Sequence, residues 1–227
     1  MNELLWIAFM LLDLTMVLLM LRLFGRIGLF VVIAYSIILC NIQVLKTVEL
    51  FGLTASLGNI LYASIFLSTD ILSEVHGKRE AQRGVVLGLI VMVLMTLYMN
   101  FALWFVPGEA DWAHGPLSEI FGLVPAVTVS SLTAYLLSQF TDVWLFHRIR
   151  QQTQGRHLWL RNNLSTLTSQ LIDSAVFTGM ATALGVFPTS VAFEIFLTTY
   201  LMKLVVAVVD TPFMYAARRI AKAAPES

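Results

Sequence analysis

The chain has 227 residues, of which 58% are hydrophobic and only 12% are charged. Because soluble domains carry about 25% charged residues, this composition excludes an ordinary water-soluble enzyme and a disordered chain. The 14 basic residues only balance the 14 acidic ones, which excludes a nucleic-acid-binding protein, and the single cysteine, Cys40, excludes an internal disulfide.

Apolar stretches long enough to cross a membrane follow one another along the chain. We expect seven spans, at 4–21, 27–45, 54–73, 84–106, 126–147, 162–186 and 190–216. The stretches are too long for barrel strands and do not alternate between polar and apolar residues. A short helix at the membrane surface is expected at 117–121, and Thr211 and Pro212 are expected to break the last span. The sequence therefore predicts an all-α fold, a polytopic transmembrane helix bundle.

The basic residues predict how this bundle is oriented. Twelve of the 14 lie in the first, third and fifth connectors and at the C-terminal end, whereas Lys46 lies in the second connector. Because Lys and Arg are enriched in cytoplasmic loops, we expect the N-terminus outside and the C-terminus in the cytoplasm. The first stretch has no basic segment before it, and we expect it to stay as an uncleaved anchor.

The third expected span carries polar and aromatic residues at helical spacing. An ionisable group in hydrocarbon costs roughly 2.5–3.5 kcal/mol, so such residues are expected to face the interior of the bundle. This stripe consists of Asn59, Tyr62, Phe66, Thr69, Asp70, Ser73 and Glu74. The alternative is that the two carboxylates, Asp70 and Glu74, lie near the lipid headgroups and pair with Lys78 or Arg79.

The sixth expected span is the most polar one. Asn162, Thr166, Gln170 and Asp173 form one line along it. Hydrogen bonding between helices explains the neutral residues, but a neutral residue would serve that purpose at lower cost than Asp173. Lys203 lies near the middle of the seventh span, where an unpaired ammonium is costly. We therefore expect Lys203 to pair with Asp173, either as a structural pair or as part of a transport mechanism.

Other polar residues are expected to have packing roles or to be solvated. Asp13 in the first span is expected to make a helix contact. Asp142 is expected to meet Arg148 or His147, which follow it in sequence. Asn41 is expected to be solvated beside the second connector, with a place in an extracellular vestibule as the alternative.

The sequence contains no recognisable catalytic or metal-binding motif. The four histidines lie far apart, and no nucleophile motif, zinc motif or phosphate-binding loop is present. We therefore expect no catalytic residues, no metal site, no cofactor and no enzymatic activity. One short pattern, Ser-Gln-x-x-Asp, occurs at 138–142 and again at 169–173, in spans that run in opposite directions. It indicates either an internal duplication or, more simply, chance.

Three sequence blocks resemble a known family. Residues 68–83, STDILSEVHGKREAQR, contain T-D-x-x-x-E-x-x-G-x-x-x-A-x-R, residues 165–173 match S-T-x-x-S-Q-x-x-D, and residues 210–213 are D-T-P-F. Their order and spacing are similar to those of the queuosine precursor transporter family, whose members resemble vitamin uptake transporters. The resemblance covers about residues 27–216. It implies a six-span core at 27–220 in a bacterial inner membrane, in a multi-pass protein. The chain departs from this pattern at its N-terminus, where residues 1–26 are expected to add a transmembrane helix, and residues 221–227 are expected to form a cytoplasmic tail.

The resemblance implies a transporter that imports queuosine precursors, 7-deazaguanines such as preQ0 and preQ1, for salvage in tRNA modification. The substrate would be a small planar nucleobase-like solute, handled within the lipid bilayer and without nucleic acid. The family also resembles the substrate-binding subunits of energy-coupling-factor transporters, so import driven by a partner ATPase is the alternative. A third interpretation is a membrane protein whose buried charges only fix helix packing, and whether the chain forms a homo-oligomer is left open.

The resemblance and the chemistry of such a ring together indicate which residues would bind it. A carboxylate can accept the N–H groups of a guanine-like edge, amides can read its oxygen, and aromatic rings can stack on it. The expected substrate-binding residues are Asp70, Asn59, Tyr62, Phe66, Asn163, Thr166, Gln170, Asp173 and Phe177. The expected coupling or gating residues are Glu74, Lys203 and Asp210.

Overall fold

The computed structural model describes residues 1–43, 46–50, 53–121, 125–185 and 189–223. Its helices are α1 (Asn2–Gln43), α2 (Gly58–Ile71), α3 (Lys78–Leu103), α4 (His114–Phe121), α5 (Pro125–Gln152), α6 (Leu158–Ala183), α7 (Thr189–Val209) and α8 (Thr211–Ala223). A π-helical turn, η1 (Leu72–His76), continues α2, and two strands, β1 (Thr47–Leu50) and β2 (Leu53–Ser56), form an antiparallel hairpin. The expected all-α bundle is confirmed, with this small hairpin in addition.

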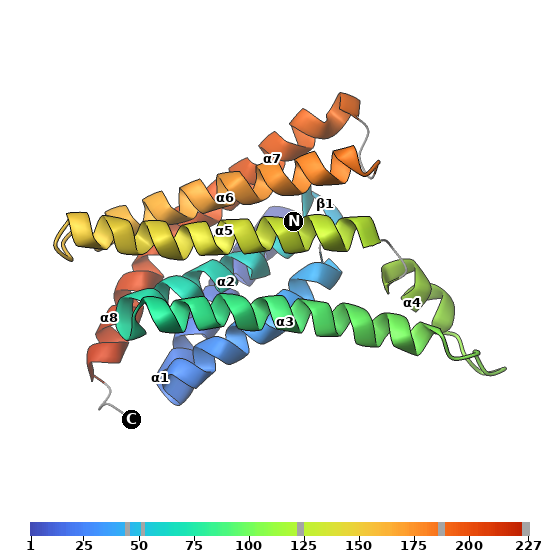
Figure 1. Cartoon of the computed structure of the whole chain (residues 1–227), viewed down its shortest axis with the longest axis horizontal. Helices are drawn as coiled ribbons and strands as arrows, with labels where there is room; N and C mark the ends of the chain where they lie inside the picture. The colour runs from blue at the N-terminus through green and yellow to red at the C-terminus, as the bar shows by residue number, and fades with distance from the viewer. Residues whose placement is uncertain (44–45, 51–52, 122–124, 186–188, 224–227) are drawn as a thin grey trace.

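The long helices lie beside one another, so their termini collect at two ends of the molecule (Figure 1). At one end, called here the basic end, the α5–α6 connection, η1 and α8 come together. At the other, called the hairpin end, lie β1 and α4. Helices α5 and α6 run antiparallel along each other, and α2 contacts α1, α3, α5, α7 and α8. The centre of the bundle is therefore built around α2.

Helix α1 consists of two helical segments that meet at Gly25. This glycine has φ 55° and ψ −136°, a conformation that a residue with a Cβ atom avoids. The break falls between the first two expected spans, 4–21 and 27–45. In the first segment Met10, Leu14, Val17 and Leu21 are buried at helical spacing. The N-terminal segment therefore packs against the bundle, and its Asp13 accepts a hydrogen bond from Ser64 of α2.

The third expected span, 54–73, begins too early in the chain. Residues 53–56 pair with residues 47–50 as strands, with Thr47 opposite Ser56, and α2 begins only at Gly58. Hydropathy alone could not place this boundary, because a short apolar run suits a strand as well as a helix. From Ile60 to Glu74, α2 and η1 are buried almost throughout, so their polar residues face protein on every side.

The seventh expected span, 190–216, is two helices and not one. Helix α7 ends at Val209, Asp210 forms a turn, and α8 begins at Thr211. Pro212 is the second residue of α8, where a backbone N–H would have no helical partner, so proline is tolerated there. The predicted break at Thr211 and Pro212 is confirmed. The short helix expected at 117–121 is present as α4 and begins earlier, at His114.

The surface of the bundle is typical of a membrane protein. Within the described residues, the stretches Asn2–Gln43, Lys78–Leu103 and Ala192–Lys222 are long and apolar enough to cross a membrane, by length and composition. Large apolar side chains four residues apart are exposed on α3 and on α7, such as Val86 and Ile90, and Leu201 and Val205. Such apolar stripes fit contact with lipid. Helices α2, α5 and α6 carry polar residues inward, and the count of seven spans stays a prediction.

Candidate functional site

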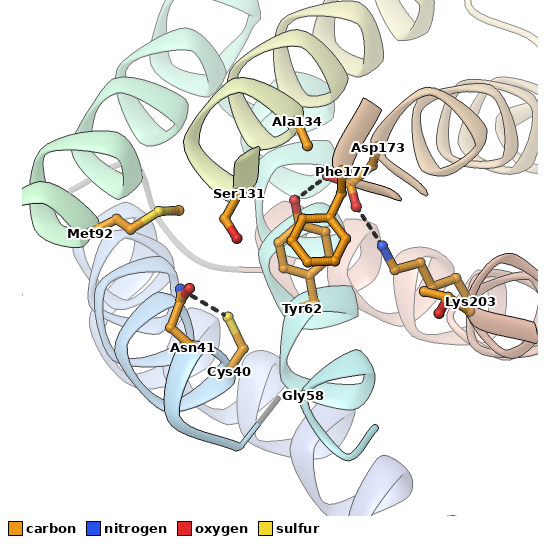
Figure 2. Close-up of a pocket in the computed structure, with 11 residues that line it drawn as sticks. Cys40, Asn41, Gly58, Tyr62, Met92, Ser131, Ala134, Asp173, Phe177 and Lys203 are labelled. Carbon is orange, nitrogen blue, oxygen red and sulfur yellow. Dashed lines mark hydrogen bonds and ion pairs between the residues drawn. The ribbon is translucent and has the colours of Figure 1, made fainter. Parts of the chain in front are cut away.

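A cavity of about 100 Å³, partly open at its mouth, lies in the half of the bundle nearer the hairpin end. Tyr62 of α2, Asp173 and Phe177 of α6, and Lys203 of α7 line one side of it (Figure 2). Residues of α1, α3 and α5 form the opposite side. The fold thus brings together four of the residues that the sequence singled out.

Lys203 and Asp173 form a buried ion pair in the cavity wall. Lys203 Nζ lies 2.5 Å from Asp173 Oδ2, and both side chains are less than a tenth exposed. The other carboxylate oxygen, Oδ1, accepts hydrogen bonds from the hydroxyls of Tyr62, at 2.6 Å, and Ser138, at 3.2 Å. The predicted pairing of Lys203 with Asp173 is confirmed. Removing one partner of such a buried pair is expected to cost about 3–5 kcal/mol, because the other charge is left uncompensated.

Aromatic rings surround this ion pair. Lys203 Nζ lies 4.7 Å from the ring centroid of Tyr62, so the ammonium contacts a π face as well as the carboxylate. The ring centroids of Phe66 and Tyr135 lie 5.5 Å and 6.4 Å from that of Tyr62. Phe66 is fully buried and does not line the cavity, although the sequence analysis expected it there. Tyr62 and Phe177 are the rings that face the cavity (Figure 2).

The repeated Ser-Gln-x-x-Asp pattern makes two equivalent hydrogen bonds between α5 and α6. Ser138 of α5 donates to Asp173 of α6 at 3.2 Å, and Ser169 of α6 donates to Asp142 of α5 at 2.8 Å. In each pattern the serine precedes the aspartate by four residues, about one helical turn. Because the two helices are antiparallel, each serine lies opposite the aspartate of the other helix. The pattern therefore fixes the register of α5 against α6.

Three buried aspartates lie on the basic-end side of the cavity. Asp70, Asp142 and Asp210 interact electrostatically with one another, and each is at most 1% exposed. Asp70 accepts a hydrogen bond from Thr166 at 3.1 Å, and Asp210 accepts one from Asn162 at 2.9 Å. We call these three aspartates the acidic layer. The expected substrate-binding residues Asp70 and Thr166, and the expected coupling residue Asp210, belong to this layer and do not line the cavity.

Asp142 lies in the acidic layer and not beside the basic residues that follow it in sequence. The expectation that it meets Arg148 or His147 was wrong, because Asp142 lies one turn from Ser138 on the face of α5 that contacts α6. Proximity in sequence suggested a local partner, whereas helical geometry turned the carboxylate toward another helix. The expectation for Asp13 is confirmed, since it is buried and accepts a hydrogen bond from Ser64 of α2.

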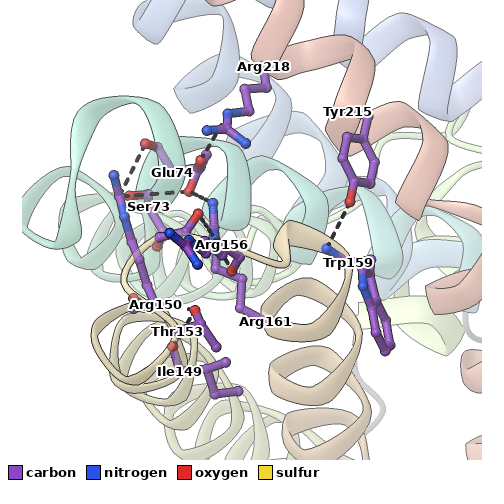
Figure 3. A network of polar contacts seen from close by, with 11 residues as sticks. Ser73, Glu74, Ile149, Arg150, Thr153, Arg156, Trp159, Arg161, Tyr215 and Arg218 are labelled. Carbon is purple, nitrogen blue, oxygen red and sulfur yellow. Dashed lines mark hydrogen bonds and ion pairs between the residues drawn. The ribbon is translucent and has the colours of Figure 1, made fainter.

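One buried carboxylate holds three arginines together at the basic end (Figure 3). The side chain of Glu74, in η1, is 5% exposed and lies 2.5 Å from Arg161 Nη2 of α6, 3.4 Å from Arg218 Nε of α8 and 3.8 Å from Arg150 Nη1 of α5. Arg161 is fully buried and also lies over the ring of Phe146, at 5.5 Å. We call Glu74 and these arginines the Glu74 cluster. Through it, one carboxylate ties four elements to one another.

The alternative expectation that Glu74 pairs with Lys78 or Arg79 was wrong. Gly77, with φ 88° and ψ 170°, ends η1, and α3 begins immediately after it. Residues 74 and 78 therefore belong to different helical segments, and the four-residue spacing does not bring their side chains together. The positive φ of Gly77 suits a residue without a Cβ atom.

Two further residues expected at the substrate site, Asn163 and Gln170, are not in the cavity lining. Asn163 donates a hydrogen bond to the hydroxyl of Thr211 at 2.7 Å, at the start of α8. Gln170 is buried nearly one turn before Asp173 and does not line the cavity. Asn59 lies in the first turn of α2, but its side chain is outside the described part of the structure.

The opposite side of the cavity was not predicted. It includes Cys40 and Asn41 of α1, Met92 of α3 and Ser131 of α5. The expectation that Asn41 is solvated beside a connector was wrong, because Asn41 is partly buried and faces the cavity. A neutral residue near the end of a span costs little wherever it points, so the sequence carried no energetic signal for these positions.

Comparison with known proteins gives consistent results. The model of a family described as "Putative vitamin uptake transporter" matches residues 56–217. The chain is 43% identical to a "Probable queuosine precursor transporter" of Bacillus subtilis, over 96% of each chain. It is 28% identical to the "Queuosine precursor transporter" of Escherichia coli over 77% of each chain. A Haemophilus influenzae protein with the same description as the first is 24% identical, over 67% of this chain and 62% of that one. No solved structure matches the chain.

Proposed function

This chain belongs to the vitamin uptake transporter family, and from that membership we propose that it is a membrane protein that imports queuosine precursors, 7-deazaguanines such as preQ0 and preQ1, for salvage in tRNA modification. The observation that carries the proposal is the agreement of two independent features. A relative described as a queuosine precursor transporter is 43% identical over nearly the whole chain. The fold, in turn, contains a cavity whose wall carries a buried ion pair and two aromatic rings.

The cavity offers the interactions that a small planar polar solute needs. Tyr62 and Phe177 present aromatic rings on which a bicyclic base can stack. Lys203, held in place by Asp173, supplies a charged donor inside a bundle where water competes weakly. In this proposal the substrate binds between α2, α6 and α7. The acidic layer, with Asp70 and Asp210, lies farther along the same route toward the basic end.

The Glu74 cluster is proposed as the closed gate of this route. By the positive-inside rule the basic end faces the cytoplasm, so the cavity lies in the half of the bundle nearer the outside. Release into the cell then requires that η1, α5, α6 and α8 separate at the basic end. Since Glu74 contacts an arginine from each of the three helices, breaking these contacts is the step that the gate must accomplish.

Uptake of a labelled precursor tests the proposed function. A host that cannot make queuosine and lacks its own importer would receive this protein as the only addition, and labelled preQ0 inside the cells would be measured. We expect accumulation above the empty-vector control and the appearance of queuosine in tRNA. A correctly inserted protein that produces neither would contradict the proposal. Asn100→Ala, a change on α3 outside the cavity lining, is a suitable control for insertion.

Two further measurements separate the alternatives. The chain could instead be the substrate-binding subunit of an energy-coupling-factor transporter. In that case the purified protein would bind preQ0 but would not move it into vesicles that contain no ATPase. If the chain is only a structural membrane protein, the detergent-purified protein would not bind preQ0 at all. Transport into ATPase-free vesicles supports the stand-alone importer.

A further inference from the structure

Some polar groups of the cavity already have hydrogen-bond partners within the protein and others do not. Asp173 belongs to the first kind. Its carboxylate accepts hydrogen bonds from Tyr62, Ser138 and Lys203, and an ionised carboxylate has about four acceptor sites. To receive two adjacent N–H groups of a guanine-like edge, Asp173 would have to release Lys203 or Tyr62. Asp173 is therefore well placed to hold Lys203 in position and poorly placed to read the solute directly.

The opposite wall of the cavity carries hydrogen-bonding groups that no other side chain uses. The amide nitrogen of Asn41 donates to the carbonyl of Ile37 at 2.7 Å and contacts Cys40 Sγ at 3.7 Å, so both of its hydrogens are directed at its own helix. Within the described part of the chain, Asn41 Oδ1 accepts no hydrogen bond and the Ser131 hydroxyl makes none. Both side chains project into the cavity between α1 and α5 (Figure 2).

We propose that Asn41 and Ser131 determine specificity by reading the N–H edge of the solute, while Lys203 binds its carbonyl oxygen. This assignment rests on the proposed function. Lys203 has three N–H donors and uses one on Asp173, which leaves two for a carbonyl in the cavity. Asn41 Oδ1 is an acceptor on the facing side, as an N–H group of the solute requires. Asp173 acts as a positioning residue through Lys203.

This arrangement defines the chemical class of the preferred solute. A ring with a carbonyl near one corner and an exocyclic amine near another can reach from α7 to α1, with Tyr62 and Phe177 against its faces. A 7-deazaguanine has both groups, whereas a 7-deazahypoxanthine has the carbonyl and lacks the amine. A site built to bond a particular N–H group discriminates strongly against an analogue without it, because the acceptor is then left unpaired.

Competition against labelled preQ0 uptake tests the assignment. For wild-type protein we expect unlabelled 7-deazaguanine to compete at least tenfold better than 7-deazahypoxanthine, a difference of about 1.4 kcal/mol. Asn41→Ala should bring this ratio close to one, by weakening 7-deazaguanine alone. Lys203→Gln should lower uptake of labelled preQ0 itself, because the carbonyl of every 7-deazaguanine loses its donor. Asn100→Ala is the matched control, because Asn100 also donates to a carbonyl one turn earlier, at 2.9 Å, yet lies outside the cavity lining.

The outcomes separate this assignment from the proposed function. Wild-type protein that takes up no labelled preQ0 contradicts the proposed function. Wild-type protein that takes it up, together with an Asn41→Ala variant of normal abundance and an unchanged competition ratio, overturns the assignment. If Asn41→Ala does not reach the membrane, Ser131→Ala, which removes a single oxygen atom, decides in its place. A competition ratio in Ser131→Ala equal to that of the wild-type protein then overturns the assignment, and a lower ratio supports it.

Discussion

Single residues decide where charge sits inside this bundle, and Lys203 is the clearest case. Its ammonium contacts the carboxylate of Asp173 and the ring face of Tyr62, so side chains of two other helices depend on this one cation. This contact was predictable from the sequence because a buried ammonium requires a carboxylate, and Asp173 was the acidic residue at matching depth in the neighbouring span. The cavity side made of neutral residues had no such requirement and was not predicted.

Removing the charge of Lys203 should therefore destabilise the protein through the partner that remains. We expect Lys203→Met to lower the melting temperature and the membrane abundance, because Asp173 would be buried without its cation, at a cost of about 3–5 kcal/mol. The double change Lys203→Met with Asp173→Leu should restore most of that loss while leaving uptake of preQ0 abolished. Thermal unfolding of the purified variants, alongside uptake, measures both. A fully stable and active Lys203→Met variant would contradict the importance given to this pair.

Among the elements, α5 and α6 behave as one hairpin, and α8 is joined to it at the basic end. The reciprocal bonds from Ser138 to Asp173 and from Ser169 to Asp142 hold α5 and α6 in register. Of the arginines of α8 in the described structure, Arg218 is the one that contacts Glu74. The pattern in α5 and α6 was visible in the sequence, but its meaning depended on which helices are neighbours.

The Glu74 cluster predicts how α8 responds when the carboxylate is neutralised. In Glu74→Gln the fully buried Arg161 loses its counter-charge, so we expect a lower melting temperature and faster cleavage of 211–223 by added protease. Glu80→Gln is the matched control, since Glu80 also contacts two arginines, Arg26 and Arg83, but those arginines are more than half exposed. Its effect should stay within about 1 kcal/mol. Equal effects of the two changes would show that the Glu74 cluster is an ordinary surface network.

For the whole molecule, hydropathy predicted the helical bundle and most helix boundaries, because a membrane-spanning helix must be apolar over a fixed length. It failed where local sequence does not determine the partner. The β1–β2 hairpin has an apolar composition that also suits a helix. Glu74 meets arginines at positions 150, 161 and 218, far along the chain, instead of the nearby Lys78 and Arg79. Long-range packing, and not composition, decided these cases.

The charge asymmetry of the whole chain predicts its orientation in the membrane. Twelve of the 14 basic residues fall on the side of the first, third and fifth connectors and the C-terminal end. A reporter fused after Ser227 should therefore be cytoplasmic, and a reporter inserted within 107–116 should be external. Paired phosphatase and fluorescent-protein fusions measure both positions. An external C-terminal reporter would mean that the Glu74 cluster faces the outside and would contradict its proposed role as a gate toward the cytoplasm.

Cys40 gives the cavity a single site for thiol labelling. It is the only cysteine among the 227 residues, it is 5% exposed, and it lines the cavity beside Asn41. A small maleimide can therefore add to the folded protein once at most, and it can do so only by entering the space assigned to the substrate. We expect mass spectrometry to find a single slow adduct, formed several times more slowly when preQ0 is present, and none in Cys40→Ala. Labelling at the same rate with and without preQ0 would mean that the ring binds elsewhere. The rate of one covalent reaction then reports the occupancy of the cavity without any measurement of transport.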